Sequence, residues 1–179
     1  MRPLWVFGYG SLIWNPGFEP VEQVIATATG YARRFCMWSI HHRGTPEAPG
    51  LVLALDADID AACSGVAFRV ADADADAVLA ALRERELVSS AYFEVNLPLS
   101  LSDGRRIDAV TYVVDPEHRQ YTGALSLKRQ AQIIAQAKGG RGPNCDYLVN
   151  TAQALAGMGL HDPELEELVR LVATDTARR

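Results

Sequence analysis

The stretch FEVNLPLSLSDGRRIDAVTYVV, residues 93–114, predicts a β-hairpin near the middle of the chain. Apolar residues alternate with polar ones on both sides of Asp103-Gly104, and an Asp-Gly pair suits a tight hairpin turn. Pro98 indicates that the first of the two strands lies at an edge or carries a bulge, because proline has no N–H for the ladder. This part of the chain is therefore expected to form antiparallel sheet.

The segments on either side of the hairpin predict an α+β fold. Alternating patterns predict strands at Leu4–Tyr9, Gln23–Thr29, Tyr31–Ser39, Leu51–Leu55 and Ser64–Val70, with the acidic DADIDAA between the last two as a loop. One helix is expected to begin at a cap, Asp72 or Asp74, and to continue to about Leu87, and a second to run from its cap Ser126 to the Gly139-Gly140 pair. A third is expected to begin at the cap Asn144 and a fourth at Asp162-Pro163. Many strands with few βαβ alternations favour a curled or barrel-like sheet with helices outside it.

The length and charge of the chain limit its number of domains and its classes of partner. A chain of 179 residues with 49% hydrophobic content is expected to form one domain, residues 1–179. A net charge of −5 supplies no basic field for nucleic acid or a membrane surface, so small molecules or proteins are the expected partners. No apolar run approaches the ~20 residues of a membrane span, and the first residues do not resemble a signal peptide. We therefore expect a cytoplasmic protein with reduced thiols at its three cysteines.

The stretch VFGYGSLIW, Val6–Trp14, is a candidate site because Gly8 and Gly10 interrupt an apolar strand. Glycine within a strand marks a bulge, a bend or a place where a ligand or another backbone comes close. The spacing fits neither a dinucleotide fingerprint nor a P-loop, and no helix is predicted directly after it. Two interpretations remain open here: a backbone turn that binds an anion, and a plain bulge.

The helix expected after Asp74 carries one glutamate on its apolar side. Glu86 lies four residues after Leu82 and seven after Leu79, whereas Glu84 is about 200° around the helix from Leu82 and should face water. Desolvation of a carboxyl group in such a position raises its pKa towards the range of a general base. The alternative is that the helix ends earlier and that Glu86 is solvated or paired with Arg83 or Arg85.

Other polar residues carry weaker signals. His41 and His42 would point in opposite directions on an extended chain, so no metal site is predicted. Arg43 could bind a substrate carboxylate or be a solvated loop residue. Alternation allows at most one of Arg33 and Arg34 to be buried.

Taken in order, several motifs resemble the ChaC-like family of γ-glutamylcyclotransferases. They are WVFGYGSLIWNPGF, YARRF, HRGTPEAPG, the RE before LVSSAY, and GPNCDYL, and the resemblance runs from about residue 4 to about residue 172. It implies a small mixed β-barrel with flanking helices. The chain departs from many relatives in having Leu51 in place of a basic residue, and from some in having LVSSA in place of a glycine pair.

The resemblance also implies a function. The family's activity is the cleavage of glutathione to 5-oxoproline and cysteinylglycine in the cytosol, with no metal or organic cofactor. Its catalytic glutamate matches Glu86, and its substrate-binding strand end matches Val6, Phe7, Gly8, Tyr9, Gly10 and Ser11. The side-chain-free turn would let backbone N–H groups approach the γ-glutamyl unit. Alternatives are a cyclotransferase for other γ-glutamyl amines or amino acids, and a non-catalytic γ-glutamyl-binding regulatory protein.

Overall fold

A computed structural model describes residues 2–178 and divides them into two compact units. The first unit consists of the chain up to Arg34 together with Ala54–His118, and the second of Phe35–Leu53 together with the chain from Arg119 onward. The expected single domain of residues 1–179 stays a prediction, and its end residues Met1 and Arg179 lie outside the described part.

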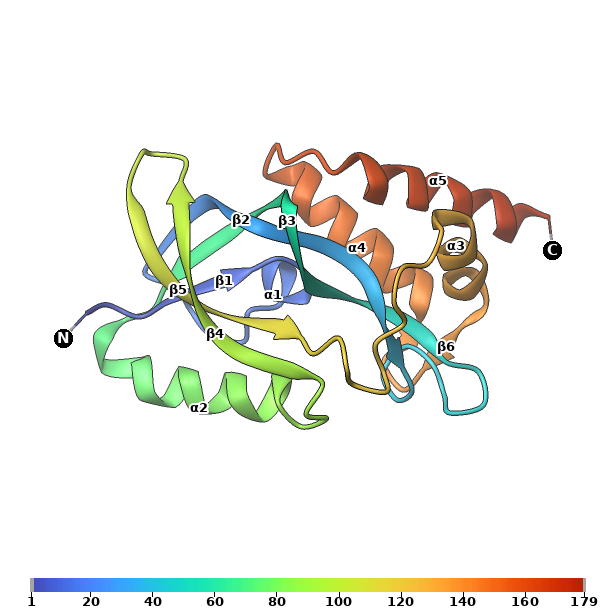
Figure 1. The fold of residues 1–179 in the computed structure, drawn as a ribbon, viewed down its shortest axis with the longest axis horizontal. Coiled ribbons are helices and arrows are strands. Elements are labelled where there is room, and N and C mark those ends of the chain that lie inside the picture. The colour runs from blue at the N-terminus through green and yellow to red at the C-terminus, as the bar shows by residue number, and fades with distance from the viewer. Residues whose placement is uncertain (1, 179) are drawn as a thin grey trace. The chain divides into compact units, whose positions relative to one another are not determined.

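Within residues 2–178, five strands close into a small mixed barrel (Figure 1) in the order β1-β3-β2-β4-β5. The strands are β1 (Trp5–Gly8), β2 (Glu22–Ser39), β3 (Gly50–Arg69), β4 (Tyr92–Leu101) and β5 (Arg106–Val114). β1 runs antiparallel to β3 and parallel to β5, where Val6 lies opposite Val110. The predicted α+β class and the small mixed barrel are confirmed.

The predicted hairpin is formed by β4 and β5. Their register runs from Tyr92 opposite Val114 to Ser100 opposite Arg106, and Gly104 in the turn has a φ of 91°. The expectation that β4 is an edge strand or carries a bulge is wrong. β4 lies between β2 and β5, and each residue from Tyr92 to Ser100 pairs with a single residue of β5. The described pairs between β4 and β2 are confined to Ser100 and Leu101, so none of them needs an N–H from Pro98.

The first half of the chain forms fewer and longer strands than expected. The two segments predicted on either side of Gly30 are one strand, β2, because Gly30 adopts a φ of 87° that lets the chain bend without ending the strand. DADIDAA is also not a loop but the middle of β3. Its carboxylates are tolerated there because Asp56 and Asp58 pair with Arg34 of β2.

The middle helix packs on the barrel of the first unit. A 3-10 turn, η1 (Asp72–Asp74), precedes α2 (Ala75–Glu86), and Figure 1 shows α2 beside the β4–β5 hairpin. Leu82 is buried in a cluster with Val6, Val110 and Tyr112. Asp74 stands at the N-cap position but makes no capping hydrogen bond with its side chain, so that part of the prediction is wrong.

The second unit contains three long helices (Figure 1) among its described residues. They are α3 (Leu127–Gln136), α4 (Asn144–Gly157) and α5 (Pro163–Ala177), and a two-stranded β6 (Lys138–Gly139) and β7 (Gly142–Pro143) lies before α4. Ser126 and Asp162 accept the capping hydrogen bonds predicted for them. The predicted end of α3 at Gly139-Gly140 is wrong, because the chain is already extended at Ala137.

Asn144 has a different role from the predicted helix cap. It is the first residue of α4, and its side chain is fully buried. The amide oxygen accepts from Leu51 N–H and the amide nitrogen donates to Leu51 C=O, both at 2.8 Å. The side chain therefore completes the hydrogen bonding of β3 instead of the helix terminus.

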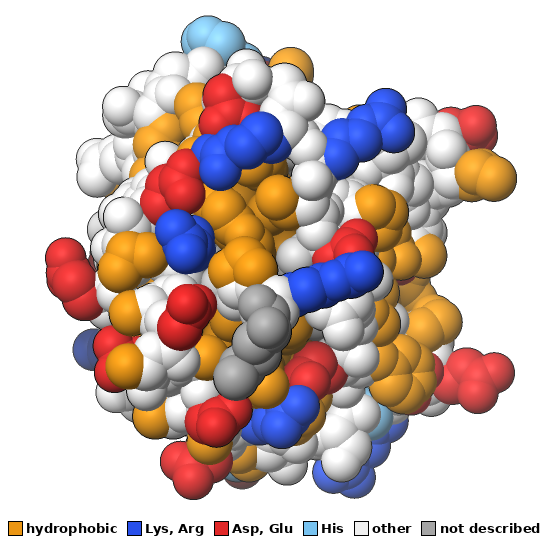
Figure 2. Space-filling view, turned by 90° about the vertical axis from the view of Figure 1, so that its left-hand side faces the viewer, with side chains coloured by type: hydrophobic (Ala, Val, Ile, Leu, Met, Phe, Trp, Pro, Cys, Tyr) orange, Lys and Arg blue, Asp and Glu red, His pale blue; other side chains and the backbone are white. Residues whose placement is uncertain are grey.

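The charged side chains form no field of one sign on the face seen in Figure 2, where acidic and basic residues are interspersed with apolar ones. Within residues 2–178, the longest apolar helical stretches fall short of what crossing a membrane requires. Cys36 and Cys63 are buried and Cys145 is half-buried, and none of these three cysteines is in a disulfide bond.

Candidate active site

The end of β1 is held tightly within the first unit. Val6 and Phe7 are fully buried, Tyr9 and Gly10 are buried, and only Ser11 is half-buried. Thr111 donates its hydroxyl to the Phe7 carbonyl at 3.1 Å, and the Tyr9 phenol donates to the Tyr112 carbonyl at 2.8 Å. Both anchors come from β5, so the hairpin fixes the strand end.

Gly8 is explained by packing rather than by open space for a ligand. A Cβ atom there would lie 2.9 Å from Cε2 of Phe68 and 3.3 Å from Cβ of Leu12. The missing side chain therefore accommodates these two residues. The expectation that no helix follows these glycines is wrong. The chain turns at Gly10 into a short helix, α1 (Ser11–Trp14), and Ile13 N–H donates to Gly10 C=O.

Glu86 occupies the last residue of α2, and its side chain is 18% exposed. Glu84 is exposed on the same helix, as its position predicted. The helix therefore does extend to Glu86. The ion pair considered as the alternative is also present, because Nε of Arg85 lies 3.4 Å from Oε1 of Glu86.

Arg85 joins Glu86 to the strand end. Its Nη2 donates to Oγ of Ser11 at 3.0 Å, and its Nη1 donates to the carbonyl of Asn15 at 2.7 Å. The Arg85 guanidinium thus contacts Ser11, Asn15 and the candidate base Glu86. Sequence reasoning considered Arg85 only as a counter-ion, because nothing in the local pattern indicates contacts about 70 residues away.

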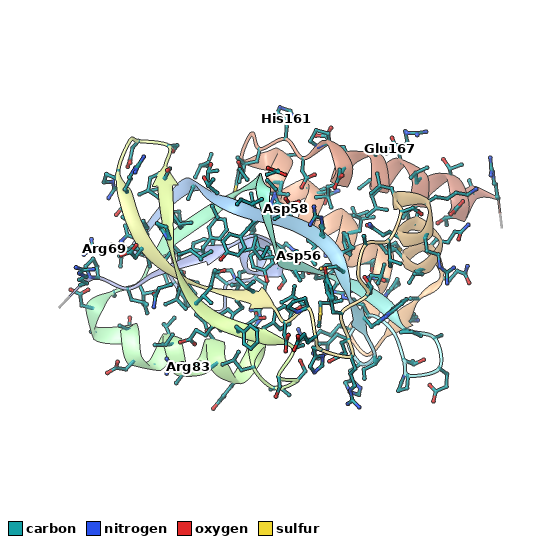
Figure 3. The ribbon with its side chains drawn as sticks, in the orientation of Figure 1. Asp56, Asp58, Arg69, Arg83, His161 and Glu167 are labelled. Atoms are coloured by element: carbon teal, nitrogen blue, oxygen red, sulfur yellow. The ribbon has the colours of Figure 1, made fainter. Side chains whose placement is uncertain are left out.

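A second polar cluster lies one helical turn before Glu86. Arg83, labelled on α2 in Figure 3, donates to both carboxylate oxygens of Glu94 at 2.8 Å, and the Tyr112 phenol donates to Glu94 at 3.2 Å. The hydrogen bond from Arg83 lowers the pKa of Glu94. Burial, followed by the negative charges of Glu94 and Glu86, raises the pKa of Tyr112.

Sequence reasoning missed this cluster, although a signal for part of it exists. Glu94 lies directly opposite Tyr112 in the hairpin register. Counting outward from the Asp103-Gly104 turn brings the two together on one face of the sheet. The contact between Arg83 and Glu94 depends on how α2 packs on the hairpin, and the strand register does not indicate that packing.

Arg43 belongs to the second unit and is buried, so it is not the solvated loop residue considered as one alternative. It is 7% exposed, its guanidinium carbon lies 5.7 Å from the ring centre of Tyr147, and Nη1 donates to the Pro143 carbonyl at 3.1 Å. His41 is exposed. No group of three or more His, Cys, Asp or Glu side chains within residues 2–178 is arranged to hold a metal ion.

The fold defines an α+β barrel protein in which Arg85 connects the Glu86 carboxylate to Ser11 at the end of β1. A ChaC-like protein family model matches residues 4–175. The chain is 36% identical over 167 residues to the glutathione-specific gamma-glutamylcyclotransferase of Escherichia coli (strain K12), covering 93% of this chain and 71% of that one. It is 32% identical over 177 residues to glutathione-specific gamma-glutamylcyclotransferase 1 of Homo sapiens, with coverage of 97% and 80%.

A solved structure agrees with these relatives. The crystal structure of the γ-glutamyl cyclotransferase specific to glutathione from yeast, in its selenomethionine form, has a TM-score of 0.90 and 25% identity, covering 100% of this chain and 99% of that one. This chain belongs to the ChaC-like family.

Proposed function

We propose that this protein is a glutathione-specific γ-glutamylcyclotransferase, which converts glutathione to 5-oxoproline and cysteinylglycine. The observation that carries the proposal is the position of Glu86, a largely buried carboxylate that Arg85 connects to Ser11 at the end of β1. The glutathione-specific relatives, which match over most of their length, support the substrate.

Glu86 is proposed as the general acid and base. The α-amino nitrogen of the γ-glutamyl unit attacks the γ-carbonyl carbon and closes the five-membered ring, while the amide bond to the cysteine nitrogen breaks. Glu86 takes the proton from the attacking amine and returns it to the departing nitrogen, a role that contributes roughly 10²–10⁴ in rate. Because the attack is intramolecular, the site needs chiefly to fold the substrate into a reactive shape.

The strand end is proposed to hold the γ-glutamyl unit. The segment consists of Val6, Phe7, Gly8, Tyr9, Gly10 and Ser11, and backbone N–H groups from around Gly8 to Ser11 would bind the α-carboxylate or the oxyanion that forms at the γ-carbonyl. Support comes from two hydrogen bonds to β5: Thr111 holds the backbone carbonyl of Phe7, and the Tyr112 carbonyl holds the side-chain phenol of Tyr9. Donors that are already fixed cost no reorganisation when the charge develops.

The proposal needs no metal or organic cofactor, because the substrate carries both its nucleophile and its leaving group and Glu86 can move the proton. We further propose a cytoplasmic location, which suits three cysteines outside disulfide bonds, and no nucleic-acid partner, which suits a net charge of −5.

The test is to incubate the chelator-treated protein with glutathione and to follow 5-oxoproline and cysteinylglycine by mass spectrometry. Glu86→Gln should fold normally and lose at least about 10²-fold in kcat, because the amide keeps the shape but cannot carry the proton. Glu84→Gln, on the exposed side of the same helix, is the matched control and should keep wild-type kcat.

The outcomes separate the alternatives. Near-normal turnover by folded Glu86→Gln would remove Glu86 from its role. If wild-type protein forms no product from glutathione, a panel of γ-glutamyl amines and amino acids tests the other cyclotransferase function. Thermal stabilisation by these compounds without their consumption would instead indicate a binding protein.

A further inference from the structure

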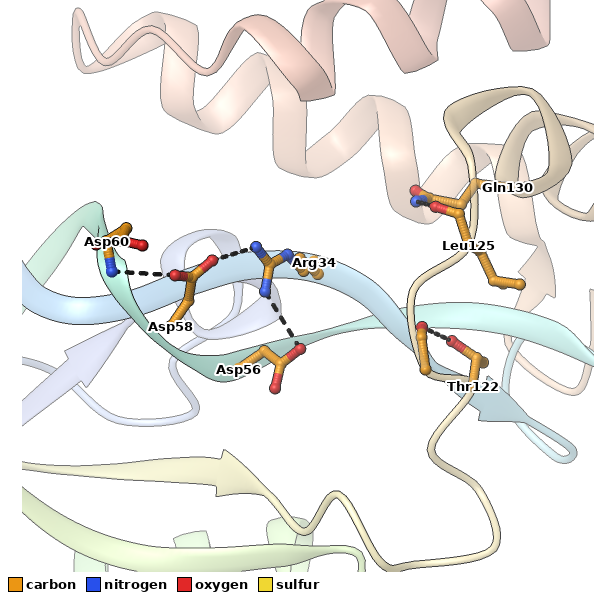
Figure 4. A network of polar contacts seen from close by, with 8 residues as sticks. Arg34, Asp56, Asp58, Asp60, Thr122, Leu125 and Gln130 are labelled. Carbon is orange, nitrogen blue, oxygen red and sulfur yellow. Dashed lines mark hydrogen bonds and ion pairs between the residues drawn. The ribbon is translucent and has the colours of Figure 1, made fainter.

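Two neighbouring arginines of β2 make contacts of different kinds. Figure 4 shows Arg34 contacting the carboxylates of Asp56 and Asp58. Its Nη1 lies 3.4 Å from Asp56 and its Nη2 lies 2.5 Å from Asp58. Arg33 instead donates to backbone carbonyls. Successive side chains of a strand point to opposite faces, which explains why adjacent arginines reach different partners.

Arg33 joins the end of β1 to β3. Its Nη1 lies 3.1 Å from the Tyr9 carbonyl and 2.8 Å from the Ser64 carbonyl, and its Nη2 lies 2.9 Å from the same Ser64 oxygen. The planar guanidinium can reach both carbonyls at once because its donors diverge at fixed angles. A lysine has one ammonium and cannot reproduce this fork.

The Tyr9 carbonyl lies just beyond the paired part of β1. The described register between β1 and β3 ends at Gly8 opposite Val66. The backbones are very close there, since a Cβ atom on Gly65 would lie 2.3 Å from the Gly8 carbonyl oxygen. Arg33 therefore fixes the backbone of Tyr9, which directly follows the last described residue pair between β1 and β3.

Fixing the Tyr9 carbonyl also fixes the next N–H. The described chain contains no cis peptide bond, and in a planar trans peptide the carbonyl and the following N–H point in opposite directions. With the Tyr9 carbonyl aimed at Arg33, the N–H of Gly10 is aimed away from Arg33. Gly10 belongs to the stretch proposed to bind the γ-glutamyl unit.

We propose that Arg33 is a positioning residue for substrate binding, which orients the Gly10 N–H by holding the Tyr9 carbonyl. The inference rests on the proposed function, because it assigns a task to Arg33 only if the strand end binds the γ-glutamyl unit. Arg33 itself makes no contact with the substrate in this scheme. It acts through the backbone.

The test compares four proteins by steady-state kinetics on glutathione: wild type, Arg33→Ala, Arg33→Lys and Arg34→Ala. Both Arg33 variants should lose about 10- to 100-fold in kcat/KM, mainly through a higher KM, because displaced donors bind the γ-glutamyl unit less well. Arg34→Ala is the matched control from the same strand. It should lower the melting temperature and leave KM unchanged.

Chemical rescue distinguishes positioning from general loss of structure. Millimolar guanidinium should restore part of kcat/KM in Arg33→Ala, because the ion can bridge the two carbonyls again, and should not affect Arg34→Ala. Wild-type KM in folded Arg33→Ala or Arg33→Lys, or an equal rise of KM in Arg34→Ala, would overturn the inference. Failure of the wild type to consume any γ-glutamyl compound would instead overturn the proposed function.

Discussion

At the residue scale, the candidate site is organised by arginines whose roles depend on what they face. Arg85 contacts Glu86, Ser11 and the Asn15 carbonyl, whereas Arg83, two residues earlier, pairs with Glu94. Two residues along a helix correspond to about 200° of rotation, so the two guanidinium groups serve different faces. Glu86 and Glu94 thus have different basic partners.

The Arg83–Glu94 pair makes stability depend on pH. The pKa of Glu94 is lowered in the folded protein by the hydrogen bond from Arg83. Its ionised form therefore stabilises the fold above the unfolded pKa of about 4.3, and this contribution is lost as the pH falls through the folded pKa. Glu94→Gln should lower the melting temperature by about 2–4 °C at pH 7, with a difference that shrinks below about pH 4.

Melting curves recorded from pH 7 down to pH 3 check this prediction. Glu84→Gln, which alters an exposed glutamate of α2, should melt like the wild type throughout. A deficit of Glu94→Gln that stays the same at pH 3 would contradict the assignment, because the carboxylate would then not be its source.

At the element scale, the loop after α2 contains a backbone position that suits glycine. Ser90 has a φ of 57°, the only positive φ of a non-glycine residue within residues 2–178, and it lies four residues after Glu86. It is exposed, and its N–H bonds to the Leu87 carbonyl at 3.3 Å.

Ser90→Gly should therefore stabilise the protein. Glycine adopts a positive φ without the steric cost that a Cβ imposes, so the free energy of unfolding should rise by about 0.5–1 kcal/mol. Ser89→Gly is the control, because its backbone is not in this region and glycine there only adds freedom to the unfolded chain. Urea titrations measure both, and a lower stability for Ser90→Gly would contradict the prediction.

At the scale of the whole molecule, contacts between distant segments complete each unit. In the first unit, β1 closes the barrel against β5, with Val6 opposite Val110. In the second, Asn144 bonds to both backbone groups of Leu51, which lies 93 positions earlier. These contacts join segments that no local pattern relates.

Asn144→Ala should be strongly destabilising. It would leave the buried N–H and C=O of Leu51 without partners, at a cost on the order of 2–4 kcal/mol. Asn150→Ala, at an exposed position of the same helix, should change stability by less than about 0.5 kcal/mol. Denaturation of both variants checks the difference, and similar stabilities would show that the Asn144 contacts contribute little.

The elements were predicted best where side chains repeat with a regular period. The hairpin of residues 93–114, the helix that ends at Glu86 and the caps at Ser126 and Asp162 all depend on local spacing or local turn chemistry. The strand lengths were predicted less well. DADIDAA lies within a strand, where Asp56 and Asp58 pair with Arg34 of β2, a partner that the composition of the segment cannot indicate.

The sequence by itself determined the α+β class, the hairpin and the side of α2 that carries Glu86, because these follow from periods of two and 3.6 residues. Only the tertiary structure decided which partners those residues meet. Arg85 reaches Ser11, Arg33 reaches the Tyr9 carbonyl, and Gly8 makes room for Phe68. The physical reason is that closure of the barrel sets these distances, and closure depends on all of its strands together.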